Sequence, residues 1–253
     1  MTKTSPLRLS YRQVMAELKA AGTEQNDKIY RNHGVTGKKY GVSYAFLKNL
    51  TKGIGIDHDL ALQLWDSEIH DARVLACWTA DKDCMTAKQL GAWARAVDNH
   101  VIACEVVGLA QDMDQAATFM TKWLGMKGEW RPVLGWGVLS RLVMQVKRGP
   151  DEGGVDDQII GEWLKQLEEN IQNAANRTRH SMNGALISIG SRKGWRTKAL
   201  AAAKRIGKIE VEYGDTSCSV NDATASIKKV VEHYAKKGKL PTDGAAGLRR
   251  RHC

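Results

Sequence analysis

YGVSYAFLKNLTKGIGIDHDLALQLWDSEIHDARVLACWTAD, residues 40–81, predicts three short helices in succession. Ser43 and Asp57 each precede a run with apolar residues three and four positions apart, as N-cap residues of amphipathic helices do. Gly53 is expected to end the first helix, because glycine is favoured just past a helix C-terminus. A third helix is expected from Ile69 to Trp78. The stretch therefore predicts helices joined by tight turns, with no strand between them.

The rest of the chain repeats this pattern, so the expected fold is all-α. About a dozen helices joined by short turns form either a globular bundle or stacked helical pairs, and no exact repeat is visible. We expect one domain over 1–240, a flexible basic tail over 241–253 and a loop near 210–217. The expected core includes Leu47, Leu64, Trp65 and Leu75. Further helices are expected over 86–97, 100–110, 112–124, 129–147, 155–175, 176–189, 194–206 and 221–236, and Thr86 is the expected N-cap of the first of these.

The composition points to a soluble, cytoplasmic protein. No apolar run approaches the roughly 20 residues that span a membrane, and the first residues lack the apolar segment of a secretory signal. The five cysteines are odd in number and include no C-x-x-C pair. This spacing favours unpaired thiols over a disulfide framework or a structural zinc site. We expect no metal and no cofactor.

Positive charge is concentrated in the last third of the chain. Residues 176–253 hold 17 Lys and Arg against 6 Asp and Glu, a net charge of +11, whereas the preceding residues sum to −1. Such asymmetry favours a polyanionic partner, most often nucleic acid, although basic proteins can be basic for solubility alone. Arginines and lysines stand near expected helix beginnings, where amides and cations can hold phosphate together; a solvated helix face is the alternative. The DNA-binding candidates are Arg131, Arg177, Arg179, Lys193 and Arg196.

The stretch WARAVDNHVIACEVV, 93–107, places several reactive side chains on one expected helix. His100 and Cys104 are i,i+4 neighbours that can form a thiolate–imidazolium pair or two ligands of a metal site, or can simply pack in the core. Asp98 and Glu105 are separated by about 10 Å of helix rise, so they form no obvious acid–base pair.

Other motifs argue against several enzyme classes. The glycine-rich segment 34–43 lacks the order of a phosphate-binding loop and is expected to connect helices. The chain has no G-x-S-x-G and no H-E-x-x-H, which excludes the classical hydrolases and metalloproteases that carry them. Trp130 and Trp136, close to Arg131, can stack on bases or fill the core.

Two blocks resemble the AlkD-like proteins of the DNA alkylation repair family. Residues 40–81 resemble its GV motif, the leucine-rich helix and the LW…H-[DE]-A-R-x-L-A segment, and residues 176–218 resemble its C-terminal part. The resemblance covers about residues 30–230. It implies HEAT-like helical pairs stacked into a C-shaped α-solenoid whose concave basic face holds duplex DNA.

The resemblance also implies a chemistry that this sequence does not retain. The family's glycosylases excise cationic alkylpurines in a cleft with two tryptophans, an aspartate and an arginine, whose electrostatics stabilise the charge that grows on the sugar. Counting onward from Trp93, the first tryptophan corresponds to His100 and the aspartate to Cys104. The arginine corresponds to Val133 and the second tryptophan to Ala185.

Two carboxylates remain as catalytic candidates. Glu105 can supply a displaced carboxylate beside Cys104, and a shifted register brings Asp98 onto the aspartate position. That shift places Ala94 at the tryptophan and breaks a gapless match from Trp65 to Trp93. The cleft-lining candidates are Trp93, His100, Cys104, Trp130, Val133, Trp136 and Ala185.

The expected function is that of an AlkD-like DNA-binding protein whose partner is double-stranded DNA. Alkylpurine glycosylase activity in divergent form stays open. The alternative is a non-enzymatic scaffold whose groove holds a protein or peptide. A third possibility is new chemistry at His100, Cys104 and Glu105.

Overall fold

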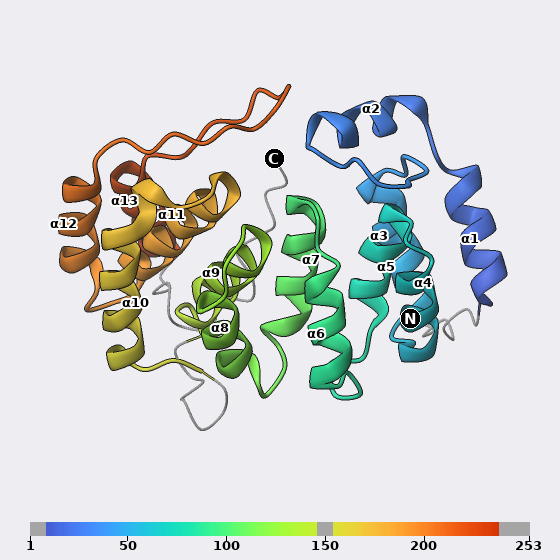
Figure 1. The fold of residues 1–253 in the computed structure, drawn as a ribbon, viewed down its shortest axis with the longest axis horizontal. Helices are drawn as coiled ribbons and strands as arrows, with labels where there is room; N and C mark the ends of the chain where they lie inside the picture. Colours follow the sequence, from blue (N-terminus) through green and yellow to red (C-terminus); the bar gives the residue numbers. More distant parts are fainter. Residues whose placement is uncertain (1–8, 146–153, 238–253) are drawn as a thin grey trace. The chain divides into compact units, whose positions relative to one another are not determined.

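The computed structural model describes residues 9–145 and 154–237, and these fall into two compact units (Figure 1). The first unit holds the described residues up to Leu109 together with Gly214–Thr216, and the second holds the others. The basic tail predicted over 241–253 lies outside the described residues.

The first unit is a succession of short helices. They are α1 (Tyr11–Ala20), α2 (Glu24–Asn32), α3 (Tyr44–Ile54), α4 (His58–Asp66), α5 (His70–Thr79), α6 (Ala87–Arg95) and α7 (His100–Ala110). The predicted N-caps are confirmed, because Ser43, Asp57 and Thr86 each accept a hydrogen bond from a backbone amide three residues on. The helices α1 and α2 precede the first helix that the sequence analysis predicted.

The predicted end of α3 at Gly53 is wrong. The helix continues to Ile54, and Gly55 is the C-cap residue, with a φ of 76°. The amide of Gly55 donates to Thr51 O at 2.8 Å, so the last turn closes at Gly55 and Gly53 stays helical. Only glycine adopts this left-handed conformation without strain, which is why the second glycine ends the helix.

The predicted core of the first unit is confirmed. Leu47, Leu64 and Leu75 are fully buried, and Trp65 is 4% exposed. The indole of Trp65 stacks on that of Trp93, with ring centroids 4.2 Å apart and planes 5° from parallel, which joins α4 to α6. Each such leucine contributes roughly 1.5–3 kcal/mol of hydrophobic free energy when buried.

The second unit continues the all-helical pattern. It comprises α8 (Ala116–Leu124), α9 (Trp130–Leu142), α10 (Asp157–Asn170), the short 3-10 helix η2 (Ile171–Asn173), α11 (Asn176–Ser191), α12 (Arg196–Ile206) and α13 (Ala223–Lys236). The central helix α11 packs on α9, α12 and α13, and α8 packs on α9. Gly190 allows the close approach of α13, because a Cβ there would lie 2.4 Å from Cδ1 of Ile227.

Three predicted helix boundaries differ from the structure by four or more residues. The helix predicted over 155–175 ends at Asn170, and the 3-10 helix η2 follows it. The helix predicted over 112–124 begins at Ala116, because Met113 N and Ala116 N donate to carbonyls three residues back and form tight turns. The helix predicted over 129–147 ends at Leu142, and residues 146 and 147 lie outside the described ranges.

Residues 207–222 form neither helix nor strand, as predicted for the loop near 210–217. Across 9–145 and 154–237 the backbone forms no strand, and one isolated bridge joins Gly22 to Val42. None of the helices in these ranges has the length and apolar character needed to cross a membrane.

Candidate functional site

The pair His100 and Cys104 occupies the first two turns of α7, where the family resemblance expects a tryptophan and an aspartate. Nε2 of His100 lies 3.5 Å from Sγ of Cys104, and both residues are half-buried. Within the described ranges no group of three or more His, Cys, Asp and Glu side chains is arranged to hold a metal ion. The pair therefore supplies two soft ligand atoms and no carboxylate.

Glu105, the first catalytic candidate, is buried and already engaged. The residue is only 1% exposed. The Tyr44 hydroxyl donates to Oε1 at 3.3 Å, and Nε1 of Trp78 donates to Oε2. Burial raises the pKa of the Tyr44 hydroxyl well above its usual value of 10.0, and the nearby Glu105 charge raises it further. The structure therefore places Glu105 in a polar contact inside the first unit, away from solvent.

Asp98, the second catalytic candidate, is exposed just before α7. Its Oδ1 accepts a hydrogen bond from Nδ2 of Asn99 at 2.7 Å. Asn99 is 4% exposed, and its side-chain oxygen accepts from Ile102 N at 3.0 Å. Asn99 thus caps the first turn of α7, and Asp98 supports that cap. No hydrogen bond joins Asp98 to Glu105 within the part of the chain that the structure describes.

Trp93, the cleft candidate nearest to this pair, is 3% exposed and lies against Trp65. The stacked indoles fill the core, so Trp93 offers no free ring face on the side that Trp65 covers. Its role in the first unit is packing.

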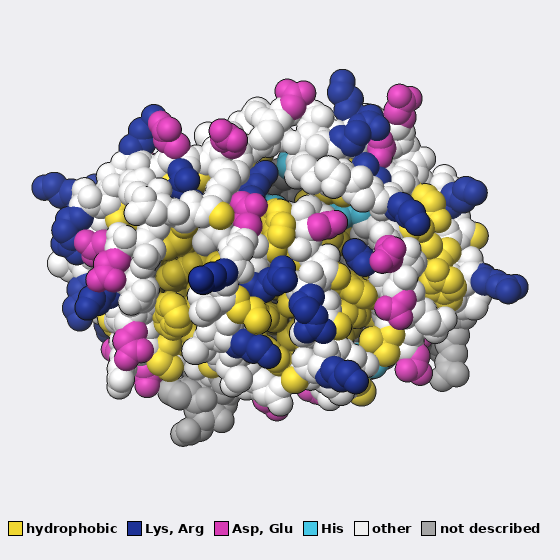
Figure 2. Space-filling model, viewed as in Figure 1, with side chains coloured by type: hydrophobic (Ala, Val, Ile, Leu, Met, Phe, Trp, Pro, Cys, Tyr) yellow, Lys and Arg dark blue, Asp and Glu magenta, His cyan; other side chains and the backbone are white. Residues whose placement is uncertain are grey.

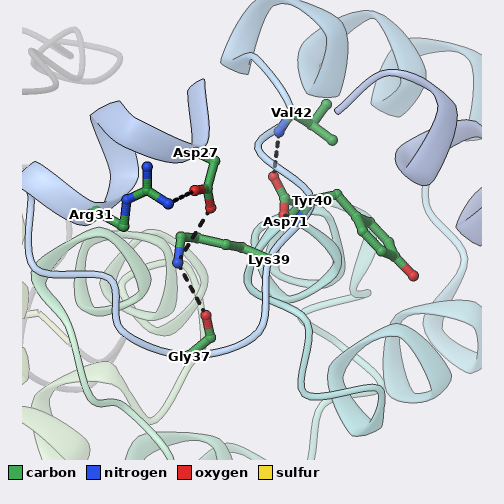
Figure 3. A network of polar contacts seen from close by, with 7 residues as sticks. All are labelled: Asp27, Arg31, Gly37, Lys39, Tyr40, Val42 and Asp71. Carbon is green, nitrogen blue, oxygen red and sulfur yellow. Dashed lines mark hydrogen bonds and ion pairs between the residues drawn. The ribbon is translucent and has the colours of Figure 1, made fainter. Parts of the chain in front are cut away.

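A polar network that the sequence analysis missed surrounds Asp71 (Figure 3). Its carboxylate is fully buried and accepts hydrogen bonds from the backbone amides of Tyr40 and Val42, both at 2.7 Å. Burial raises the pKa of Asp71, although those amides act in the opposite direction. The carboxylate therefore anchors the glycine-rich segment 34–43, which connects α2 to α3 as predicted.

Lys39 in the same segment is also engaged (Figure 3). Its Nζ lies 3.4 Å from Oδ1 of Asp27 and 3.4 Å from the carbonyl of Gly37, and its side chain is only 9% exposed. Arg31 pairs with the other oxygen of the same aspartate. Lys39 therefore ties the connecting segment to α2, whereas the pair of Arg31 and Asp27 lies within α2.

His70, next to Asp71, is the second buried polar group that the sequence analysis missed. It is 3% exposed, and within the described ranges neither ring nitrogen has a hydrogen-bond partner. Its ring meets that of Tyr30 edge-on at 4.7 Å. Burial lowers the pKa of His70 to about 3, and the charges of Lys39 and Arg73 lower it in the same direction. The imidazole is therefore neutral at pH 7.

The cleft candidates of the second unit are mostly packed inside it. Val133 is 3% exposed, and Ala185 is completely buried. Trp136 is 5% exposed and meets Trp163 edge-on at 5.8 Å. Trp130 and Arg131, at the start of α9, are half-buried. The two positions where the family resemblance expects an arginine and a tryptophan are thus apolar core in this chain.

The basic candidates divide into engaged and exposed side chains. Arg179 donates from Nη1 to Glu210 O at 2.7 Å and from Nη2 to Ala174 O at 3.1 Å. Its guanidinium therefore fixes the backbone at these two residues. Lys193 and Arg196, at the start of α12, are exposed, and no ion pair involves them among the described residues. Figure 2 shows Lys and Arg side chains gathered over α12, at the left edge of the view.

Arg177, in the first turn of α11, is half-buried and held at two points. Its backbone amide donates to Oε1 of Glu129 at 2.6 Å. Its guanidinium carbon lies 5.0 Å from the ring centroid of Tyr213, which is within the range of a cation–π contact. The hydroxyl of Tyr213 lies 2.7 Å from Nδ1 of His180. The contact was missed because Tyr213 lies 33 residues beyond His180 in the sequence.

Comparison with known proteins agrees with the expected family and fold. The profile of the DNA alkylation repair enzyme family matches residues 14–227. An uncharacterized protein of Listeria innocua is 28% identical over 228 residues, covering 87% of this chain and 97% of the relative. An uncharacterized protein of Listeria monocytogenes is 27% identical over the same length and coverage.

A solved structure superposes with a TM-score of 0.79 at 24% identity, covering 92% of this chain and 97% of the other. It is described as representing a new family of proteins related to the HEAT-like repeat DNA glycosylases with affinity for branched DNA structures. The superposition confirms the predicted HEAT-like helical fold.

Proposed function

Because the chain belongs to the DNA alkylation repair enzyme family, we propose that it binds DNA and does not excise bases by the mechanism of the family's glycosylases. The burial of Glu105 carries this proposal. The carboxylate closest in sequence to Cys104 is 1% exposed and bound by Tyr44 and Trp78, so it is not placed to stabilise charge on a bound sugar.

The replaced positions support the same conclusion. Excision of a cationic base requires groups that stabilise positive charge at the sugar, and a preorganised carboxylate is worth several kcal/mol in such a site. His100 and Cys104 bring no carboxylate to this position. Val133 and Ala185 are buried, so neither can present a side chain to a lesion.

The exposed cations of the second unit support DNA binding. Lys193 and Arg196 face solvent at the start of α12, where the first amides of the helix carry partial positive charge. No side chain caps α12 in the structure. Arg131 and Arg177 are the half-buried candidates beside the start of α9 and α11. Contacts of this kind position a phosphate backbone without reading its sequence.

We further propose that branched DNA is the preferred partner. The structural relative belongs to a family with affinity for branched DNA, and this chain shares its fold over nearly its whole length. A protein that contacts phosphates and lacks an excision site selects DNA by shape, and a junction presents a shape that linear duplex lacks.

The test is a titration of fluorescent linear duplex, abasic-analogue duplex and four-way junction, at about 50 and 200 mM salt, where phosphate contacts are most and least favourable. We expect binding that weakens steeply with salt and is tightest for the junction. A parallel assay with methylated DNA should release no base. Base release would overturn the non-excising proposal. No binding of any DNA at low salt would overturn the DNA proposal and favour the protein or peptide scaffold.

A further inference from the structure

The side chain of Arg177 rests on a ring that is itself fixed. Tyr213 is 6% exposed, and its hydroxyl lies 2.7 Å from Nδ1 of His180. The two rings are perpendicular, with centroids 5.5 Å apart. The guanidinium carbon of Arg177 lies over the Tyr213 ring, 5.0 Å from its centroid, so the cation rests against an immobilised aromatic ring.

The backbone that carries Tyr213 is held just as firmly. The Asn176 side chain donates to Glu212 O and accepts from Glu212 N, both at 2.8 Å. Arg179 donates to Glu210 O at 2.7 Å. Side chains from the first turns of α11 thus clasp residues 210–213, which form no strand of their own. Tyr213 therefore cannot move away from α11 without breaking three hydrogen bonds.

The charge of Arg177 is not balanced by a carboxylate in the described residues. No ion pair involves its guanidinium there, and the nearby Glu129 carboxylate binds the backbone amide instead. The charge also acts on its neighbour, because burial first and Arg177 second lower the pKa of His180 to about 4. A neutral imidazole at pH 7 can accept a hydrogen bond that the Tyr213 hydroxyl donates. Arg177 sits in the first turn of α11, where a cation is electrostatically unfavourable.

We infer that Arg177 binds a phosphodiester of DNA, and that Tyr213 and His180 are positioning residues that hold its guanidinium for that contact. A planar guanidinium offers paired donors that match two phosphate oxygens. The contact with Tyr213 already restricts the side-chain rotamers of Arg177. Less rotamer freedom is therefore lost when the guanidinium binds the phosphate oxygens. This inference rests on the proposed function, and it separates Arg177 from Arg179, whose Nη1 and Nη2 both already donate to backbone carbonyls.

The experiment measures affinity for the four-way junction and its salt dependence in five single variants and in the double variant that combines Arg177→Gln with Tyr213→Leu. Arg177→Gln removes the contact, Arg177→Lys keeps the charge without the fork, Tyr213→Leu removes the ring, and Tyr213→Phe keeps it. Lys165→Gln is the matched charge control, because Lys165 is an exposed cation of the same unit. Circular dichroism of each variant establishes that it is folded.

We expect Arg177→Gln to weaken binding roughly 5- to 10-fold and to reduce the salt slope by about 0.9, the value for one lost phosphate contact on duplex DNA. Arg177→Lys should bind about 3-fold more weakly with an unchanged slope, because it keeps the charge and loses the paired donors. Tyr213→Leu should weaken binding about 3-fold, and adding it to Arg177→Gln should cost nothing further. Tyr213→Phe, which keeps the ring and loses its hydrogen bond to His180, should bind more tightly than Tyr213→Leu and more weakly than the unaltered protein. Lys165→Gln should bind like the unaltered protein.

The outcomes separate this inference from the proposed function. If the unaltered protein binds no DNA, the proposed function fails. If it binds and Arg177→Gln keeps both affinity and slope, the phosphate role of Arg177 is overturned and DNA binding stands. If Arg177→Gln weakens binding while folded Tyr213→Leu does not, the positioning role of Tyr213 is overturned. If Tyr213→Leu does not fold, Arg177→Lys is the deciding variant. If it binds as tightly as the unaltered protein, the paired donors of the Arg177 guanidinium are not needed and the inference is overturned.

Discussion

Oε1 of Glu129, at the start of α9, lies 2.6 Å from the backbone nitrogen of Arg177, so Glu129 caps the first turn of α11 from another helix. The hydroxyl of Thr178 donates to Glu129 O at 2.9 Å and strengthens the same contact between α11 and the start of α9. Helix α11 has no N-cap side chain of its own, and Glu129 takes that role across 48 residues.

Glu129→Ala is expected to lower the free energy of unfolding by about 1–2 kcal/mol, as loss of a helix cap does. Glu129→Gln keeps an acceptor at the same place and should lose less than half as much. Urea unfolding measures both. Equal losses in the two variants would mean that the charge of Glu129, and not its hydrogen bond, stabilises the start of α11.

Glu105→Ala is expected to destabilise the first unit by at least about 2 kcal/mol, because it removes the buried carboxylate to which the Tyr44 hydroxyl and the Trp78 indole donate. Glu105→Gln keeps one acceptor oxygen and should be milder. Neither variant should change affinity for junction DNA, since Glu105 is buried. An excision activity that vanishes in folded Glu105→Gln would contradict a structural role.

His70→Leu is expected to reduce the loss of stability on acidification. The pKa values of His70 and His180 are lowered in the fold to about 3 and 4. Both therefore stabilise the fold above pH 6.5, and this contribution is lost as the pH falls toward the folded values. Each histidine accounts for about 1 kcal/mol between about pH 6 and pH 5.

The measurement is the free energy of unfolding at several pH values in that window. In His70→Leu the pH dependence should fall by the contribution of one histidine, whatever the stability of the variant at pH 7. A slope identical to that of the unaltered protein would show that His70 is accessible to protons in the fold.

Lys193→Gln and Arg196→Gln are each expected to reduce the salt slope of junction binding by about 0.9 and to change unfolding free energy by less than about 0.5 kcal/mol, because both side chains are exposed. Arg179→Gln is the matched control, because it also removes one positive charge but from a side chain that is engaged within the fold. It should lower stability by about 1–3 kcal/mol through its two lost carbonyl contacts and leave the slope unchanged. If all three lower the slope equally, the division into exposed and engaged cations is wrong.

The local signals in the sequence were sufficient for most helices. Ser43, Asp57 and Thr86 were predicted as N-caps because a cap depends on residues within one turn, and all three were confirmed. The end of α3 was misplaced because Gly53 and Gly55 are equally suitable in sequence. Only the turn that follows Gly55, with its positive φ, selects between them.

The candidate site was less predictable because its contacts are long-range. Glu105 was read as an available carboxylate, and its burial depends on Tyr44 and Trp78, which lie 61 and 27 residues away. Arg177 was predicted from charge alone. Its partner Tyr213 is 36 residues on, in a segment without regular structure, and no periodicity connects the two.

The parallel stack of Trp65 on Trp93 gives the first unit an optical reporter of its own. Indoles this close share their excited state, so near-ultraviolet ellipticity and fluorescence depend on the pair and not on either ring alone. Loss of that signal follows the separation of α4 from α6, independently of events in the second unit. Comparison of that signal with far-ultraviolet ellipticity, which reports the helices of both units, therefore tells whether the two units unfold together or in turn.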